Sequence, residues 1–471
     1  MIIKTSVRVS CENSEVLGAL PARILALAVQ ASQLFHALAE SAALVHAAAN
    51  NLTLVTPVQG EGWAHALLIA GFRAGAQFRR TIAPGTTHTL WIEGGRAYAS
   101  GANPDGYAHE RFLLGQEGAD DAASAMGMMI RPVIRLANVA IVEVAVGIMH
   151  SLALSSTGTV FSFGTNAFGQ LGSASCDAQS PHQVLGLKHG TARRVSCGSY
   201  YSMVIDACGA LYTFGANHYG QLCRHTDSSD GNLPTLADDQ LPRLQQAAGG
   251  RAHTLLLTLA GRVYAAGRNE YGQLGDGCTS GSPTADPSPT VHVGLQSRIA
   301  QVACGQNHSL AVSNTGEVWS WGCDEGGQII TGAYDTRTPV PASLGAPGSV
   351  RILQVVAGIY HSVLLSANGD VYLVGRGCPR PGSVRSEADV EAISKQRFDE
   401  PLKVGMAATQ IYAGARNTIV ANGASPRVVH AWGAAREGQC GFQPDAVLGY
   451  EGSTGIQHEI RRVLLPGQSL E

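Results

Sequence analysis

The amino-acid sequence predicts an all-β fold, a seven-bladed β-propeller of four-stranded blades. One sequence phrase recurs seven times at a nearly constant interval along the 471 residues. Glycine is abundant, at 57 residues, whereas charged residues make up only 14% of the chain. Each copy of the phrase also contains two short apolar segments separated by a glycine-containing turn. Together these features indicate many short strands joined by tight turns.

The recurring phrase opens with Gly-x-x-His and an apolar run, passes through a polar turn to Val-aromatic-x-x-Gly, and often ends in Gly-Gln-Leu-Gly. We call the position of its histidine the His slot. The seven slots hold His88, His150, Tyr201, His253, His308, His361 and Asn417. Successive slots are 62, 51, 52, 55, 53 and 56 residues apart. A step this constant indicates a structural repeat.

The sequence of each copy predicts a β-hairpin. In the copy around His150, residues 151–154 and 160–163 alternate in the manner of strands, and Gly158 lies in the turn between them. Two more strands are expected before the next copy, at residues 182–185 and 193–196. Four strands in about 50 residues make one propeller blade, which relies on neighbouring blades to cover its faces.

The sequence Gly-Thr-Asn-Ala-Phe-Gly-Gln-Leu-Gly at residues 164–172, and its counterpart at 267–275, resemble the repeat of the regulator of chromosome condensation family. The resemblance extends from about residue 84 to residue 441 and implies a seven-bladed propeller. Members of that family usually close the ring by pairing strands from the two chain ends. We therefore expect residues 459–465 to form the outer strand of the blade that contains His88.

The chain is expected to divide into an N-terminal segment, residues 1–80, and a propeller, residues 81–471. The first segment is rich in alanine and leucine, and two interpretations stay open. It is a degenerate blade, since His36 precedes His88 by 52 residues, or a helical cap, since alanine favours helices. Neither a membrane-spanning run nor a secretion signal is recognised, so we expect a cytoplasmic or nuclear protein.

The repeated histidines invite a catalytic or metal-binding interpretation, but the ring symmetry places them in separate blades. We expect them to form hydrogen bonds with neighbouring strands, as buried polar groups must. The Gly-Gln-Leu-Gly runs lack the spacing of phosphate loops, and no catalytic motif is found. The sequence thus predicts no catalytic residue, no metal and no cofactor. A net charge of −3 without a basic tail also argues against direct nucleic-acid binding.

Function is expected in the residues that differ between copies, mainly at the turns. The candidate partner-binding residues are Asn166, Phe168, His218, Tyr219, Asn269, Tyr271, Asp324 and Glu325 in the turns, with Asp227 and Asp230 in an acidic insertion. The founding member of the resembled family promotes nucleotide exchange on a nuclear GTPase. The resemblance therefore implies a protein partner, with a small GTPase as one candidate. The alternative is a scaffold in a tubulin-linked, RNA-modification or ubiquitin-related complex. We expect a monomer that does not bind membranes.

Overall fold

The structure is a computed structural model and describes the chain from residue 80 to residue 463 with gaps. The described residues are 80–101, 130–173, 178–187, 192–224, 232–238, 240–279, 291–330, 336–342, 350–376, 401–422, 428–434, 440 and 456–463. All of them belong to the second of the two units into which the chain divides, residues 79–471. The two interpretations of the N-terminal segment fall on residues outside this set.

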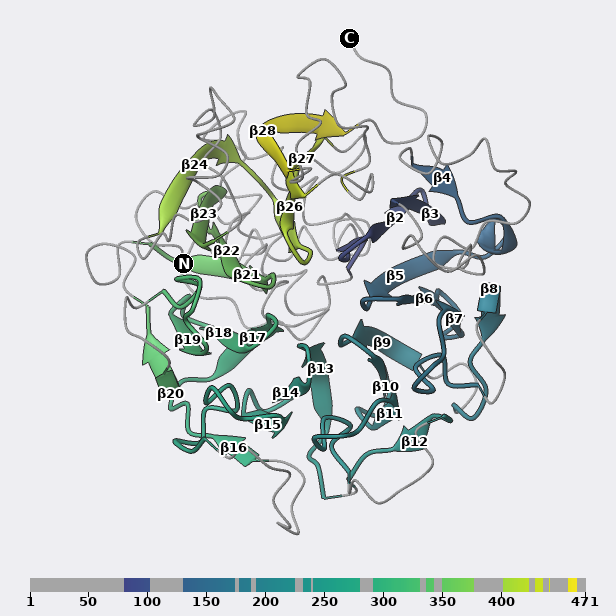
Figure 1. Ribbon diagram of the computed structural model, residues 1–471, viewed down its shortest axis with the longest axis horizontal. Coiled ribbons are helices and arrows are strands. Elements are labelled where there is room, and N and C mark those ends of the chain that lie inside the picture. Colours follow the sequence, from purple (N-terminus) through teal and green to yellow (C-terminus); the bar gives the residue numbers. More distant parts are fainter. Residues whose placement is uncertain are drawn as a thin grey trace, which may run out of the picture. The chain divides into compact units, whose positions relative to one another are not determined.

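Seven four-stranded antiparallel sheets form the blades of a ring, which confirms the predicted propeller (Figure 1). The first three blades are β1 (Ile82–Pro84), β2 (His88–Glu93), β3 (Arg96–Gly101) and β4 (Arg131–Pro132); β5 (Ile141–Val146), β6 (His150–Ser155), β7 (Val160–Gly164) and β8 (Ala178–Gln183); and β9 (Ala192–Cys197), β10 (Tyr201–Asp206), β11 (Leu211–Gly215) and β12 (Thr235–Leu236). A 3-10 helix, η2 (Ile134–Leu136), lies between the first two.

The remaining four blades follow in the same order along the chain. They are β13 (Leu244–Gly249), β14 (His253–Thr258), β15 (Val263–Gly267) and β16 (Val291–Val293); β17 (Ile299–Cys304), β18 (His308–Ser313), β19 (Val318–Gly322) and β20 (Thr336–Pro341); β21 (Ile352–Ala357), β22 (His361–Ser366), β23 (Asp370–Gly375) and β24 (Leu402–Ala407); and β25 (Gln410–Ala413), β26 (Asn417–Asn422), β27 (Val428–Ala434) and β28 (Ile456–Val463). Within the described ranges, no helix has the length and apolarity that a membrane crossing requires.

The hydrophobic core lies between the blades. Each of seven buried clusters joins two neighbouring blades, and the one between the first and second contains Leu90, Val144 and Phe163. The second strand of a blade is covered on both faces by such clusters, so all six residues of β6 are buried. This explains why the sequence shows a near-continuous apolar run after each His slot.

The blades are offset by one strand from the sequence repeat. Residues 193–196 were expected to be the last strand of the blade that contains His150. Instead β9 pairs with β10 of the next blade, with Ser202 opposite Cys197, so this expectation is wrong. The physical reason is the short connection of residues 198–200, which makes β9 and β10 a hairpin. The other expected strand, residues 182–185, overlaps the end of β8, which begins four residues earlier than expected.

The C-terminal strand also departs from expectation. Strand β28 completes the seventh blade by pairing with β27, with Val463 opposite Val429. The expectation that it completes the blade of His88 is wrong, because β4 already occupies that edge, with Pro132 opposite Tyr98. Among the described strands, each blade is therefore a continuous stretch of chain, and none of them is exchanged between the chain ends.

The ring instead closes through side chains at the junction between the seventh and first blades. Ile82 and Trp91 of the first blade share one buried cluster with Ile419 of the seventh. The hydroxyl groups of Thr81 and Tyr412 are hydrogen-bonded at 2.8 Å. Closure thus depends on the same kind of apolar contact that joins the other blades.

A hydrogen-bonded chain, which we call the His clasp, joins each slot histidine to the next blade. Nε2 of His150 lies 3.0 Å from Oγ of Ser202, and this hydroxyl donates to the carbonyl oxygen of Gln170 at 2.7 Å. A serine hydroxyl has one proton, so Nε2 of the histidine must be the donor. The clasp therefore requires an imidazole that carries a proton on Nε2.

The clasp recurs around the ring with the residue that follows each slot. The corresponding pairs are His88 with Ser151 at 2.9 Å, His253 with Ser309 at 3.1 Å, His308 with Ser362 at 3.1 Å and His361 with Thr418 at 3.3 Å. Tyr201 replaces the imidazole in one slot, and its hydroxyl donates to the carbonyl oxygen of His253 in the next blade at 2.6 Å. The prediction that the repeated histidines bond to neighbouring strands is confirmed.

The glycine of Gly-x-x-His is also part of the clasp. The imidazole ring of His150 lies against Gly147, and a Cβ atom on this glycine would overlap the ring. The same overlap would arise between Gly305 and His308. The spacing of glycine and histidine in the repeat thus follows from direct packing of one residue on the other.

Burial keeps the slot histidines neutral. It lowers the pKa of His88, His253 and His361 to about 4, and the pKa of His150 and His308 to about 3, from an ordinary value of 6.5. An imidazolium ion would also have no acceptor at Nδ1 in the packed junction, where that atom is buried without a partner in His150 and His308. These histidines therefore act as neutral structural groups.

We expect the propeller to lose stability steeply in mild acid. The folded pKa of each slot histidine lies below its unfolded value, so the unfolded chain binds more protons and stability falls as pH drops from 6.5 towards 4. Five such residues give a slope of about 7 kcal/mol per pH unit near pH 5. Urea unfolding at a series of pH values measures this slope.

The variant His308→Asn provides the control, since asparagine naturally fills the slot at residue 417. Its slope should be smaller by about 1.4 kcal/mol per pH unit, which corresponds to one proton. An unchanged slope in this variant would show that His308 does not titrate with the depressed pKa that the clasp requires.

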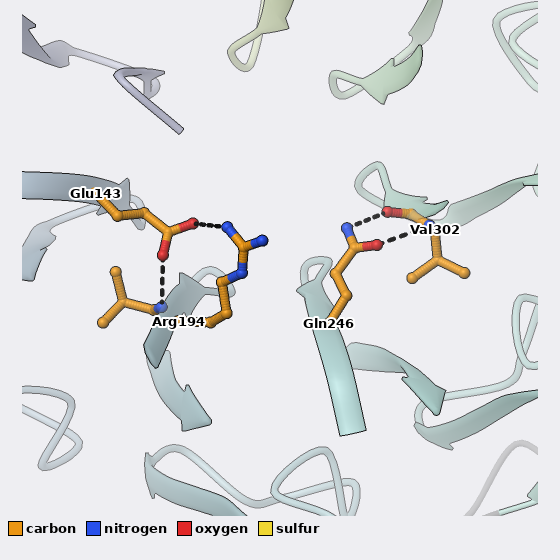
Figure 2. A network of polar contacts seen from close by, with 5 residues as sticks. Glu143, Arg194, Gln246 and Val302 are labelled. Carbon is orange, nitrogen blue, oxygen red and sulfur yellow. Dashed lines mark hydrogen bonds and ion pairs between the residues drawn. The ribbon is translucent and has the colours of Figure 1, made fainter. Parts of the chain in front are cut away.

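A second set of contacts joins the innermost strands and is shown in Figure 2. Nε2 of Gln246 on β13 donates to the carbonyl oxygen of Val302 at 2.8 Å, and its Oε1 accepts from the Val302 N–H at 3.1 Å. The same paired hydrogen bonds link Gln301 to Val355 and Gln354 to Ile411. A side-chain amide suits this position because it donates and accepts at once.

Two neighbouring blades replace this glutamine by an ion pair (Figure 2). Glu143 accepts from the N–H of Val195 at 3.4 Å and pairs with Nη1 of Arg194 at the same distance. Arg194 occupies the glutamine position of the next blade. Burial raises the pKa of Glu143, and the positive charges of Arg194 and Arg80 oppose that shift. The charged form of the buried Glu143 carboxyl group is thus favoured by its partner Arg194.

We expect Arg194→Gln to destabilise the propeller by about 3 kcal/mol at pH 7, because it leaves the buried carboxylate of Glu143 without its main partner. The pKa of Glu143 is raised in the folded state, so this loss should shrink as pH falls and the carboxylate takes up a proton. The double variant Glu143→Gln with Arg194→Gln restores the glutamine pattern and should recover wild-type stability to within about 1 kcal/mol. Urea unfolding of the three proteins in parallel measures both effects. A double variant as unstable as the single one would contradict the interpretation.

Candidate interaction surface

The turn after the third strand has the same hydrogen-bonded frame in four consecutive blades. In the second blade, Oδ1 of Asn166 accepts from the N–H of Leu171 at 2.9 Å, and Oε1 of Gln170 accepts from the N–H of Phe168 at 2.9 Å. The corresponding pairs are Asn217 with Gln221, Asn269 with Gln273 and Asp324 with Gln328. The Asn and Gln of the repeat thus build the turn.

This frame separates the predicted site residues into two groups. Asn166, Asn269 and Asp324 direct an oxygen into their own turn, and the last two are only 1% exposed. The residues between the frame positions are accessible instead: His218 and Glu325 are exposed, Phe168 is 42% exposed, and Tyr219 and Tyr271 are half-buried. Because the frame repeats, these side chains lie at corresponding places on one face of the ring.

Aromatic side chains from neighbouring blades meet on this face. The ring of Phe168 lies 5.2 Å from that of Tyr200 and 5.9 Å from that of His218, which it meets edge-on. The guanidinium group of Arg268 lies 5.4 Å from the ring centre of Tyr219, a distance typical of cation–π contact. We call these five residues the aromatic patch.

The patch therefore brings together three predicted residues, Phe168, His218 and Tyr219. Tyr271 lies in the turn that follows Arg268, whose guanidinium group also pairs with Glu270. Asp227 and Asp230 fall outside the described residues. Sequence reasoning missed Tyr200 and Arg268, although both occupy variable positions of the repeat, one in Gly-x-x-His and the other in Gly-x-Asn.

The chemistry of the patch suits binding. Aromatic residues and arginine are the residue types enriched in protein interfaces and in their energetic hot spots. The cross-blade ring contacts also hold the side chains in place, which lowers the entropy cost of ordering them on association.

The adjacent residues Asp324 and Glu325 allow the turn and surface roles to be separated. We expect Asp324→Ala to cost about 1–3 kcal/mol of stability, because the buried N–H of Ile329 loses its acceptor. Glu325→Ala should change stability by less than about 0.5 kcal/mol, since this side chain is exposed. Thermal and urea unfolding of the pair tests this, and equal effects would contradict the assignment.

Comparison with known protein families matches residues 69–344, more than half of the chain, to the RCC1-like domain. Among curated proteins, the probable E3 ubiquitin-protein ligase HERC4 of Mus musculus is 35% identical over 206 residues, which cover 43% of this chain and 19% of the ligase. The ultraviolet-B receptor UVR8 of Arabidopsis thaliana is 28% identical over 367 residues, covering 77% of this chain and 78% of the receptor. The chain thus spans about a fifth of the length of HERC4.

Solved structures show the same fold. Prp20p of Saccharomyces cerevisiae superposes with a TM-score of 0.63 at 19% identity, covering 85% of this chain and 89% of Prp20p. Human WBSCR16 superposes with a TM-score of 0.58 at 22% identity, covering 70% of this chain and 83% of that protein.

Proposed function

Because the chain belongs to the RCC1-like domain family, we propose that it is a regulatory protein-binding propeller whose partner is a small GTPase. The observation that carries the proposal is the aromatic patch, which gathers Phe168, Tyr200, His218, Tyr219 and Arg268 on one face. Action as a monomer in the cytoplasm or nucleus belongs to the same proposal.

The class of partner comes from the resemblance and from a structural neighbour. The founding member of the resembled family promotes nucleotide exchange on a GTPase, and Prp20p has been characterised for its binding to Gsp1p and histones. Both observations favour a small GTPase as the class of partner.

Nucleotide exchange on a GTPase involves no covalent step, so the propeller needs no catalytic residue for it. A surface that binds the nucleotide-free GTPase more tightly than the loaded form lowers nucleotide affinity by the same factor, because the two binding equilibria are coupled. Aromatic side chains held in fixed positions suit such differential binding, since they would contact apolar loops of the GTPase without reacting with the nucleotide phosphates.

The release of labelled GDP from a panel of small GTPases tests the proposal. We expect at least one member to release nucleotide faster with the wild-type propeller. The variant Phe168→Ala/His218→Ala/Tyr219→Ala should lose at least about tenfold of this acceleration, as expected for hot-spot residues.

The control is Arg96→Ala, which changes an exposed residue at the start of β3 in the first blade and should retain full acceleration. Acceleration of no GTPase by the wild-type protein would overturn the exchange role. Binding without acceleration would instead indicate a scaffold.

A further inference from the structure

The glutamine of the surface turn in the second blade forms hydrogen bonds in two directions. Its side chain bonds within its own turn, since Oε1 of Gln170 accepts from the N–H of Phe168 at 2.9 Å. Its carbonyl oxygen bonds to the next blade, since it accepts from the hydroxyl of Ser202 at 2.7 Å. Ser202 is itself bonded to His150 in the clasp. Because Gln170 is fully buried, a buried residue connects an exposed side chain of the aromatic patch to the blade junction.

The third blade repeats this arrangement with another residue of the patch. Oε1 of Gln221 accepts from the N–H of Tyr219 at 2.9 Å, and the carbonyl oxygen of Gln221 accepts from the hydroxyl of Thr254 at 2.7 Å. Ser202 and Thr254 are the second residues of β10 and β14, and both are fully buried. Neither hydroxyl reaches the surface, yet each is linked through one glutamine to the backbone of a patch residue.

The Ser202 hydrogen bond also sets the spacing of two aromatic rings. Tyr200 lies two residues before Ser202, and its ring lies 5.2 Å from that of Phe168. The hydroxyl of Ser202 therefore ties the turn that carries Phe168 to the strand that follows Tyr200. Support of this kind reduces the conformational freedom that binding groups lose when a partner associates.

The carbonyl oxygen of Gln170 depends on a single donor. Among the residues that the structure describes, only Ser202 donates to it. In the fourth blade the carbonyl of Gln273 accepts from Nε1 of Trp321 at 2.9 Å in addition to the clasp hydroxyl. The residue that pairs with Ser202 across its hairpin, at the place of Trp321, is Phe214, whose side chain has no donor. Loss of the Ser202 hydroxyl would thus leave a buried carbonyl without its hydrogen bond, which is costly.

The fifth blade contains the same network without an aromatic residue in the turn. The carbonyl of Gln328 accepts from Ser362 at 2.8 Å, and Oε1 of Gln328 accepts from the N–H of Gly326 at 2.7 Å. Ser362 is fully buried and bonded to His308 at 3.1 Å. Removal of this hydroxyl should therefore disturb an equivalent junction, but only removal of the Ser202 hydroxyl should disturb the aromatic patch.

We propose that Ser202 and Thr254 are positioning residues of the aromatic patch, which act through Gln170 and Gln221 on the two turns. This inference rests on the proposed function, since it takes the patch as the site that contacts the GTPase. The binding site then includes a buried layer in which a turn of one blade is held by a hydroxyl group of the next blade. A substitution that does not touch the partner should weaken binding by allowing the patch turns to move.

Amide hydrogen exchange of the full chain, resolved by residue, tests the positioning role without any partner. In Ser202→Ala the N–H of Phe168 should exchange at least about tenfold faster than in the wild type, because loss of a buried hydrogen bond lets the turn open more often. Ser362→Ala should leave this rate unchanged. Ser202→Thr should retain slow exchange, since threonine fills this position in the next blade as Thr254. Urea unfolding checks that both alanine variants are folded.

A second variant tests the same role at the other turn. Thr254→Val keeps the branched shape of the side chain and removes its hydroxyl, so the N–H of Tyr219 should exchange at least about tenfold faster. This comparison also decides the matter if Ser202→Ala does not fold.

The release of labelled GDP then tests the consequence for binding, with a GTPase that the wild-type chain accelerates. Ser202→Ala and Thr254→Val should each lose at least about fivefold of the acceleration, as expected from one lost hydrogen bond. Ser362→Ala and Ser202→Thr should keep the acceleration to within about twofold.

Unchanged exchange at Phe168 in Ser202→Ala, or an equal increase there in Ser362→Ala, would overturn the positioning role. Equal loss of GDP release in Ser202→Ala and Ser362→Ala would overturn it as well, since the effect would then be one of general stability. Acceleration of no GTPase by the wild-type chain would overturn the nucleotide-exchange function alone, because the amide exchange rates decide the positioning role independently.

Discussion

The His clasp is the interaction on which the rest of the structure depends. A blade cannot bury both of its faces alone, so the ring exists only if each junction combines apolar packing with satisfied polar groups. The clasp meets this requirement because the imidazole of His150 donates a hydrogen bond to the hydroxyl of Ser202, and this hydroxyl donates to the carbonyl oxygen of Gln170. The glycine before each histidine makes room for its ring. Most of the repeated phrase can be explained by this one contact.

Because the His clasp holds the blades together, the positions of the repeat outside it can vary. Because the clasp and the Asn–Gln frame fix the backbone, side chains between the frame positions can change without loss of the turn. This is where Phe168, His218 and Tyr219 lie. At the other end of the blades, the residue before the first strand also varies, from Ala140 in the second blade to arginine in the fourth, fifth and sixth. Residues that differ between blades therefore lie at both ends of the conserved strands.

Sequence reasoning predicted the part of the fold that repeats and failed where the ring departs from repetition. Seven His slots at a near-constant step were enough to predict seven blades. The offset of β9 was missed because the repeat shows where a unit recurs but not where a blade begins. The place of β28 was wrong because the family resemblance suggested closure by the chain ends, whereas β4 fills that edge. Tyr200 and Arg268 were missed because their contacts cross blade junctions, which spacing along one chain does not reveal.

The most direct test of this account is the protonation state of the slot imidazoles. Long-range proton–nitrogen correlation spectra of the ¹⁵N-histidine-labelled protein report which ring nitrogen carries the proton. The account predicts that His88, His150, His253, His308 and His361 are neutral and protonated at Nε2, and that they remain so from neutral pH to about 5, since burial lowers the pKa of each to about 4 or 3. Protonation at Nδ1, or titration near 6.5 in the folded protein, would contradict it.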